Sequence, residues 1–325
     1  MKVYCKYGTR KKTENHFSSV TGDCMTTFIK VTEIWVPTQP RNQLELSSGI
    51  YGELSDFKAS SEHIRFNYNQ GLPGTAWALA HPLVITDFSH SCFKRTEAAQ
   101  KAGLTCAIAV PIFSGEFLLA VIVFLCGDDE EHAGAIEIWA NDADRDNELG
   151  VIDGYYGTLD YFEFISRKTK IMKGFGLPGR VWEKGLPILM ADLGESDSFI
   201  RGRDAKNAGI TTALGIPLSD IAGQVYMMTF LSAKATPIAR QIEIWMPDTD
   251  RQRLIFKEGF NENKCNLGAL YATKSYAKNE GNLGRVWLSG SPAIVEQAAG
   301  NELIPTLLMP IIDKGQLKAI IVFCL

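Results

Sequence analysis

The stretch Gly176-Leu-Pro-Gly-Arg-Val-Trp182 decides how the chain is organised, because its pattern occurs three times. A Gly-x-x-Gly-x-x-Trp motif ends at Trp77, Trp182 and Trp287, so both intervals between the motifs are 105 residues long. The other three tryptophans each close a Glu-Ile-Trp triplet at nearly the same spacing, and they are Trp35, Trp139 and Trp245. A fixed period in a sequence is the signature of a repeated structural unit. The chain therefore consists of three homologous units.

The composition is that of a folded globular protein, with 325 residues of which 46% are hydrophobic and 22% are charged. A formal net charge of -4 provides no positive field for nucleic acid or anionic lipid. The apolar run from Phe117 to Cys126 has ten residues, whereas a membrane helix needs roughly 20. Seven cysteines without a Cys-x-x-Cys pair are typical of reduced thiols. We expect a cytoplasmic protein with neither nucleic acid nor a membrane as a partner.

Each unit has the same predicted order of elements. The Glu-Ile-Trp run predicts a strand whose alternation places Ile and Trp on opposite faces unless a bulge intervenes, and a hairpin turn follows. The glycine motif predicts a tight loop that opens a short helix, because glycine permits positive φ and close backbone approach. A proline then leads to an edge strand, and two hydrophobic strands close the unit.

Units one and two also share a Phe-x-Arg helix before the closing strands. We predict that this helix begins after Ser91 or Ser198 as N-cap and ends at Gly103 or Gly209 as C-cap. In unit three the two aligned prolines are only 18 residues apart, against 29 and 30 residues in units one and two. The helix is therefore expected to be missing from unit three.

Taken together, these motifs resemble the GAF domain. The resemblance rests on Gly-Leu-Pro-Gly-x-x-Trp, a Pro and an Asp on the next strand, Phe-x-Arg followed by Ala-Gly, a Val/Ile-Pro strand end and a final Val-x-x-Phe-Leu strand. It implies an α+β fold of three tandem GAF-like units, each with a central antiparallel sheet of five or six strands and flanking short helices. The expected units span residues 1–131, 132–236 and 237–325.

In this family a small-molecule pocket lies between the sheet and the segment that runs from the glycine motif to the short helix. Carried over by position, the resemblance implies eight ligand-binding residues, which are Trp77, Asp87, Phe93, Arg95, Trp182, Asp192, Phe199 and Arg201. Arginine with aspartate suits a ligand with an anionic or amide group, and the rings suit a flat or apolar body. The alternative interpretation makes the same aromatic residues core packing and the Arg-Asp pairs structural ion pairs.

Enzymatic and metal chemistry have weaker sequence support. A sulfoxide reductase built on the GAF fold uses a Gly-x-Cys-Gly motif, but unit one has Gly71-Leu-Pro-Gly74, so Cys92 is left as the redox candidate. The run from Asp142 to Glu148 resembles half of a calcium loop but has Asn147 where that loop requires glycine. No nucleophile, general base or metal-ligand set repeats between units. We predict no catalytic residue, no metal and no cofactor.

These features predict a stand-alone sensory or signalling protein that binds an unidentified small molecule in the GAF-type pockets of units one and two. The third unit would serve as an interaction or capping module, through a partner protein or self-association. The first alternative is a non-enzymatic scaffold or protein-interaction module with degenerate pockets. The second alternative is a cysteine-dependent reductase of the sulfoxide-reductase type that uses Cys92.

Overall fold

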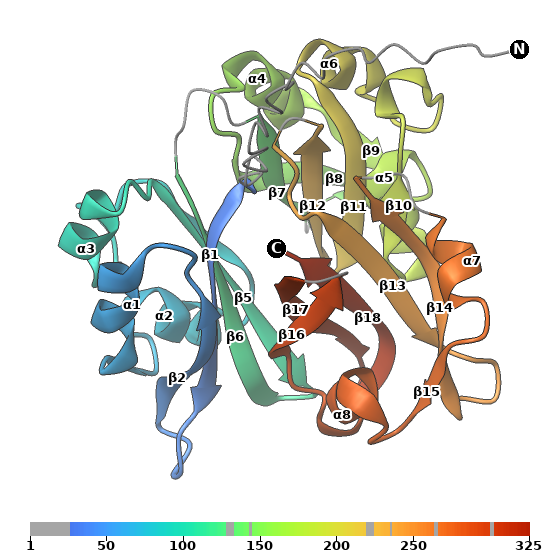
Figure 1. Cartoon of the computed structure of the whole chain (residues 1–325). Helices are drawn as coiled ribbons and strands as arrows, with labels where there is room; N and C mark the ends of the chain where they lie inside the picture. The colour runs from blue at the N-terminus through green and yellow to red at the C-terminus, as the bar shows by residue number, and fades with distance from the viewer. Residues whose placement is uncertain are drawn as a thin grey trace, which may run out of the picture.

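Three antiparallel sheets form the framework of the molecule (Figure 1). The computed structural model describes residues 27–127, 133–142, 145–218, 224–234, 236–262, 266–299 and 302–325. No helix in this part of the chain is long and apolar enough to cross a membrane. Residues 143 and 144 of the calcium-loop candidate, the run from Asp142 to Glu148, lie outside the described residues.

In the described residues, each unit has six strands and two to four short helices. The elements of unit one are β1 (Ile29–Pro37), β2 (Gln43–Ile50), α1 (Ser55–Glu62), β3 (Arg65–Asn67), α2 (Gly71–Leu79), β4 (Leu83–Ile85), α3 (Thr96–Lys101), β5 (Cys106–Ser114) and β6 (Phe117–Cys126). Those of unit two are β7 (Gly134–Asp142), β8 (Arg145–Tyr155), α4 (Asp160–Lys168), β9 (Lys170–Met172), α5 (Gly176–Lys184), β10 (Ile188–Met190), the 3-10 turn η1 (Leu193–Glu195), α6 (Gly202–Asn207), β11 (Ile210–Pro217) and β12 (Tyr226–Ala233). Those of unit three are β13 (Gln241–Pro247), β14 (Arg253–Asn261), α7 (Leu267–Tyr271), β15 (Ser275–Ala277), α8 (Gly281–Ser289), β16 (Ala293–Ala299), β17 (Glu302–Asp313) and β18 (Gln316–Cys324).

The strand order within each unit is the same. Read from the same edge, the sheets run β3-β2-β1-β6-β5-β4, β9-β8-β7-β12-β11-β10 and β15-β14-β13-β18-β17-β16. In every unit the strand with the Glu-Ile-Trp triplet pairs with the closing strand at the centre of the sheet, and the strand after the proline forms an edge. The predicted α+β fold and the repeat of one sheet per unit are therefore confirmed.

The pairing of β1, β7 and β13 with β2, β8 and β14 shifts by one residue between Ile and Trp of each triplet. The extra residue lies on the neighbouring strand, so the triplet itself keeps its alternation. Ile34 packs in a core that all three units share, whereas Trp35 packs in the core of unit one alone. The triplets of units two and three divide their residues in the same way. The prediction that Ile and Trp face opposite sides is confirmed.

The glycine motifs begin α2, α5 and α8, as predicted. The first glycines Gly71, Gly176 and Gly281 have φ values of 63°, 55° and 61°. A Cβ on the second glycine of unit one, Gly74, would lie 2.1 Å from the carbonyl oxygen of Asn67. Positive φ at the first glycine and close backbone approach at the second are thus the two reasons for the motif.

The Phe-x-Arg helix is shorter than predicted. Arg95 and Arg201 occupy the N-cap positions of α3 and α6, so the predicted starts after Ser91 and Ser198 are wrong. The segment before each helix stays irregular because its Phe and Arg side chains are buried inside the unit. The C-caps are Ala102 and Ala208, one residue before the predicted Gly103 and Gly209. The two glycines follow with φ values of 65° and 72°, so they still mark the helix ends.

Unit three replaces this helix with a longer sheet edge. β16 has seven residues and pairs directly with β17, whereas β4 and β10 each have three. Within residues 293–299 and 302–313 the chain forms strands and no Phe-x-Arg helix. The predicted loss of the helix in unit three is confirmed.

The inner faces of the three sheets pack into one central core. Its buried residues come from all three units. Phe124 and Phe230 lie with ring centroids 5.7 Å apart, and Phe230 and Phe323 lie 5.3 Å apart. Elsewhere along the core, the strand prolines of the three units surround a gap of about 20 Å³, and they are Pro111, Pro217 and Pro310. Equivalent residues of the three units thus lie close together at two places in the core, at the phenylalanines and at the prolines. The units are therefore arranged around a pseudo-threefold axis.

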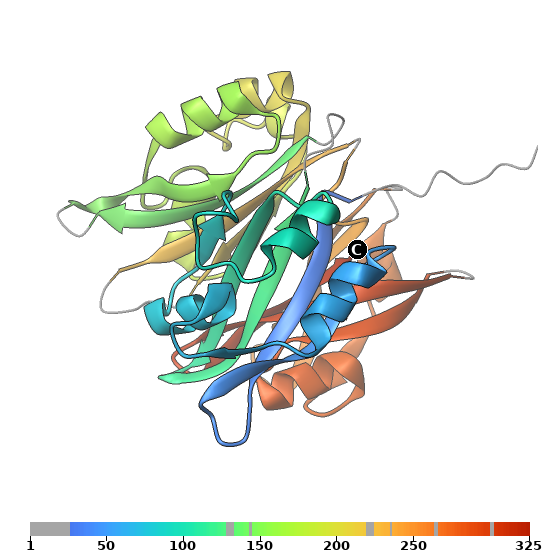
Figure 2. The same cartoon turned by 90° about the vertical axis from the view of Figure 1, so that its left-hand side faces the viewer.

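Edge strands close the three units into a ring. β4 contacts β8, β10 contacts β14, and β16 contacts β2. The backbone N–H of Leu189 donates to Glu258 Oε1 over 3.4 Å, which joins units two and three. Figure 2 shows the helices on the outside of the molecule and the sheets toward its middle. A binding site of the expected kind must therefore lie on the outer face of a sheet, under its own helices.

Candidate functional sites in the three units

A buried carboxylate lies on the outer face of each sheet. Glu33, Glu137 and Glu243 begin the three Glu-Ile-Trp triplets and are 0%, 0% and 2% exposed. Each lies two strand residues before its tryptophan, so the two side chains point to the same face. The indole Nε1–H donates to the carboxylate Oε2 over 2.9, 3.0 and 2.6 Å in units one, two and three.

A tyrosine hydroxyl is the second donor to each carboxylate. Tyr51 donates to Glu33 Oε1 over 3.0 Å, and Tyr156 donates to Glu137 Oε1 over 3.1 Å. A glycine lies opposite each glutamate on the neighbouring strand. In units one and two it leaves room for the tyrosine, since a Cβ on Gly49 would lie 2.4 Å from the Tyr51 ring and one on Gly154 would lie 3.2 Å from the Tyr156 ring. In unit three the tyrosine comes instead from α7.

In unit one an arginine neutralises the buried carboxylate. Arg95 Nη2 donates to Glu33 Oε2 over 2.7 Å, and its Nη1 bonds to Glu33 Oε1 and to the Ser61 hydroxyl. Ser61 also donates to Glu33 Oε1 over 2.9 Å. Two parallel bonds from a planar guanidinium to a carboxylate are the strongest geometry for such a pair.

Unit two repeats this network with one exchanged member. Arg201 Nη2 donates to Glu137 Oε2 over 2.9 Å, and Nη1 bonds to Glu137 Oε1 and to Ser166. Thr229 donates to Glu137 Oε2 over 2.8 Å. Burial by itself would raise the pKa of the Glu137 carboxyl, but the Arg201 charge and these hydrogen bonds outweigh it and hold the pKa below its ordinary value. Burial and the Glu137 charge raise the pKa of Tyr156.

Aromatic rings surround both guanidinium groups. Arg95 Cζ lies 4.6, 5.5 and 5.6 Å from the ring centroids of Phe57, Phe93 and Trp35. Arg201 Cζ has the matching neighbours at 4.9 to 5.4 Å, namely Phe162, Trp139 and Phe199. Cations favour the faces of aromatic rings. Beside these buried carboxylates, units one and two thus hold a cation of their own.

Unit three has the carboxylate without the arginine. Glu243 Oε1 accepts hydrogen bonds from Tyr271 OH at 2.7 Å and from Gln241 Nε2 at 2.5 Å. Among the described residues, Glu243 takes part in no ion pair. Glu243 and Trp245 instead line a cavity of about 190 Å³.

The structure brings together half of the eight residues that the resemblance implies. Phe93, Arg95, Phe199 and Arg201 join the two buried networks. Asp87 is not their partner, because its side chain is 62% exposed and bonds to His90 Nδ1 over 2.9 Å. This bond, with two backbone N–H donors, lowers the pKa of Asp87.

The remaining three predicted residues also lie outside the networks. Trp77 packs edge-on against Tyr68 with centroids 5.2 Å apart, and Lys173 Nζ lies 5.2 Å from the ring of Trp182. Asp192 is exposed and lines a separate hollow of about 200 Å³. Sequence reasoning missed Glu33 and its equivalents, although a glutamate that repeats inside an apolar strand was the signal that could have found them.

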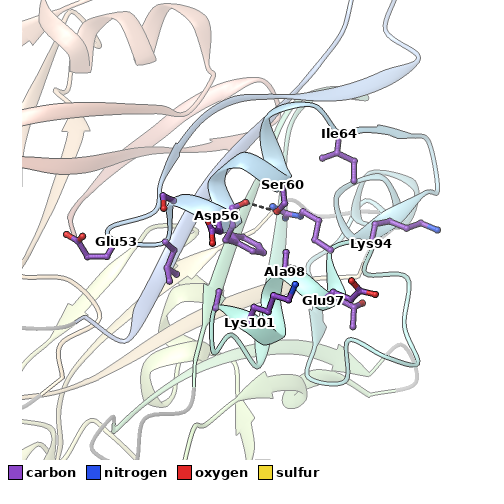
Figure 3. A pocket seen from close by; sticks show the side chains of 14 residues that line it. Glu53, Asp56, Ser60, Ile64, Lys94, Glu97, Ala98 and Lys101 are labelled. Atoms are coloured by element: carbon purple, nitrogen blue, oxygen red, sulfur yellow. Dashed lines mark hydrogen bonds between the residues drawn. The ribbon is translucent and has the colours of Figure 1, made fainter.

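An open groove of about 750 Å³ runs between α1 and α3 of unit one (Figure 3). Glu53 and Asp56 line it on the α1 side, and Lys94 and Lys101 line it on the α3 side together with Glu97. The buried side chains Arg95 and Phe57 also line the groove. A molecule in this groove would therefore contact the Arg95 that holds Glu33.

Cys92 does not belong to any of these sites. It is a partly buried free thiol that packs against the core of unit one, and it is not among the residues that line the groove. Among the described residues there is no group of three or more His, Cys, Asp or Glu side chains that could hold a metal ion.

Comparisons with known proteins found matches only among solved structures, and each match covers only part of this chain. No protein-family model and no curated protein matches the sequence. The matching solved structures include free methionine-R-sulfoxide reductase from Neisseria meningitidis with its substrate, at 18% identity and a TM-score of 0.24. They include the A. aeolicus nlh2 GAF domain in an inactive state, at 23% and 0.25, and the GAF domain of an Acinetobacter phosphoenolpyruvate-protein phosphotransferase, at 16% and 0.23.

Each of these matches spans about one unit. They cover 30%, 32% and 30% of this chain and 52%, 61% and 54% of the other chains, respectively. The chain thus spans little more than half the length of the solved structures it matches. The assignment rests on the repeated motifs and on the three sheets with one strand order. By these features the chain is a tandem of three GAF-like units.

Proposed function

We propose that the protein is a non-enzymatic sensory protein that binds a small molecule in the groove between α1 and α3 of unit one. The observation that carries this proposal is the groove itself, whose volume of about 750 Å³ falls within the roughly 300 to 1,000 Å³ of small-molecule sites. Arg95 at its inner side supplies a route from the ligand to the central strand β1, because Arg95 is bonded to Glu33.

The charges along the groove favour a zwitterion. Carboxylates on the α1 side would face an ammonium group, and Lys94 and Lys101 on the α3 side, which outnumber Glu97 there, would face a carboxylate. Among the described residues, the groove is lined by no Cys or His, so it offers neither a thiol nucleophile nor a neutral general base. Binding without chemistry is the function that this lining supports.

Unit two does not share this lining. The positions that correspond to Asp56, Ser60 and Lys94 hold Tyr161, Ile165 and Ile200. The proposed zwitterion site is therefore specific to unit one. Unit two shares with unit one the buried ion pair between arginine and glutamate, but not the charged groove. The sequence analysis expected ligand pockets in both units, whereas the proposal places a pocket in unit one alone.

Thermal shift of the full chain with the free amino acids, each at about 10 mM, tests the proposal. A ligand at a hundred times its Kd stabilises the fold by about 2.7 kcal/mol, which raises Tm by several degrees in a chain of this size. Asp56→Asn should remove the shift. Asp160→Asn, at the first turn of the equivalent helix α4, is the matched control and should keep it.

A second candidate function is a scaffold whose units have lost their pockets. The favouring observation is that Arg95 and Arg201, with their aromatic neighbours, fill the space beside the buried glutamates of units one and two. If no amino acid raises Tm, or if Asp56→Asn and Asp160→Asn behave alike, the scaffold becomes the better account and the zwitterion site is abandoned.

A further inference from the structure

The buried carboxylate of unit three has three neutral donors, as many as in each of the other units, and no charged donor among the described residues. In unit one the neutral donors to Glu33 are Trp35, Tyr51 and Ser61, and in unit two those to Glu137 are Trp139, Tyr156 and Thr229. In unit three they are Trp245, Tyr271 and Gln241. The bonds that unit three lacks are the two from the arginine.

A cavity occupies the side of Glu243 that an arginine could fill. Glu243 and Trp245 line it, and their equivalents in units one and two are the residues that contact the arginine. Its volume of about 190 Å³ is room for on the order of six water molecules. A carboxylate has roughly four acceptor positions and the neutral donors use three, so Glu243 Oε2 keeps one for a ligand.

The walls of this cavity are aromatic. The Trp245 ring lies 5.3 Å from those of Tyr271 and Tyr276, and all three residues line the cavity. Of the charged residues at the mouth, Glu296 and Lys274 are both exposed, and Lys274 Nζ lies 5.0 Å from the Tyr271 ring. Their charges offset one another, which leaves the buried Glu243 as the net charge of the site.

Two neighbouring groups sense the negative charge of Glu243. Burial and the Glu243 charge raise the pKa of the Tyr271 phenol. Burial, with a contribution from the same charge, raises the pKa of the Cys324 thiol to about 11. A cation in the cavity would relieve a buried negative charge that has no ion-pair partner in the described part of the chain.

We propose that unit three binds a small organic cation bearing a guanidinium group, held by Glu243 and by the rings of Trp245, Tyr271 and Tyr276. The ligand takes the place that the side chains of Arg95 and Arg201 occupy in the other two units. This site is separate from the groove of unit one, so the two proposals stand or fall independently.

Calorimetric titration of the full chain with ethylguanidinium tests this inference. One equivalent should bind per chain, whereas ethylurea, which has the same number of heavy atoms and no charge, should not bind. Propylammonium should bind at least fivefold more weakly, because a compact, strongly hydrated ammonium does not stack on the aromatic walls as a planar guanidinium does. Equal binding of ethylguanidinium and ethylurea, or of ethylguanidinium and propylammonium, would overturn the assignment.

Variants locate the site. Glu243→Gln should weaken ethylguanidinium at least tenfold, and the matched control Glu296→Gln at the mouth should change it less than threefold. Tyr276→Leu keeps the carboxylate and removes a ring, so it should weaken binding about threefold or more, which provides a second test if Glu243→Gln does not fold. Unchanged binding in a folded Glu243→Gln chain, or loss of binding in Asp56→Asn, would show that the cation binds elsewhere.

Discussion

At the residue scale, the molecule is organised around one glutamate per unit. Glu33 and Glu137 lie in the interior, where an unpaired charge is costly, and each is bonded twice to an arginine 62 or 64 residues away. A buried ion pair adds little stability compared with an apolar pair, but the loss of one partner is expensive. Each network therefore fixes both residue positions, because the loss of either the arginine or the glutamate would leave an unpaired charge in the interior.

Loss of Arg201 should destabilise the chain strongly. Arg201→Met keeps much of the side-chain volume but leaves Glu137 buried without a cation, and we expect the free energy of unfolding to fall by about 3 to 5 kcal/mol. Urea unfolding measures this change. Arg203→Met, an exposed position on the same helix α6, should change it by less than about 0.5 kcal/mol. Similar losses in both variants would show that the Arg201 pair has no special role.

The Glu137 carboxyl should also shape the acid stability of the protein. Its pKa is held below the ordinary 4.5 by Arg201 and the neighbouring donors, in spite of burial. The carboxylate therefore contributes stability that is present above pH 4.5 and is lost as the pH falls through the lowered value. We expect the free energy of unfolding, measured in urea across this acid range, to fall less steeply for Glu137→Gln than for the natural chain. Equal slopes would contradict the assignment, and Glu183→Gln at an exposed position serves as the control.

At the element scale, local signals were enough to predict the sheets and most of the helices. The paired glycines determined the starts of α2, α5 and α8, and the shortened interval between prolines predicted the missing helix of unit three. The start of α3 could not be predicted, because nothing local shows that Arg95 turns inward to a glutamate on β1. The ion pair with Glu33 places Arg95 at the N-cap, and the helix begins at Thr96.

The same limit explains why half of the candidate site was missed. Arginine and phenylalanine were found through their repeat, but their partner was expected to be Asp87, which is close in sequence. The structure pairs the arginine with a strand residue instead. In unit three the replacement of Ser61 by Tyr271 on the equivalent helix hides the relation further, since the tyrosine hydroxyl arrives from a different element.

At the scale of the whole molecule, the central core is the feature that sequence patterns could not reveal. Strands such as β6 and β12 are buried on both faces, so their apolar runs show no alternation that would separate an inner face from an outer one. The outer faces pack under the helices of one unit, and the inner faces pack against the other two units. The three units therefore share the apolar surface that each would need in order to be stable alone.

This shared core predicts one cooperative unfolding transition for the described body. Phe230 contacts both Phe124 and Phe323 and is 1% exposed, so Phe230→Ala opens a cavity that borders all three units. We expect a loss of about 3 to 5 kcal/mol, seen in calorimetry as one peak that moves to lower temperature as a whole. Phe175→Ala removes a ring that is 63% exposed in the same unit. It should change the free energy of unfolding by less than about 0.5 kcal/mol and leave the peak almost unmoved. If the units unfolded independently, calorimetry would show separate peaks. Only the peak of unit two would then move, because the cavity would destabilise only the unit that contains it.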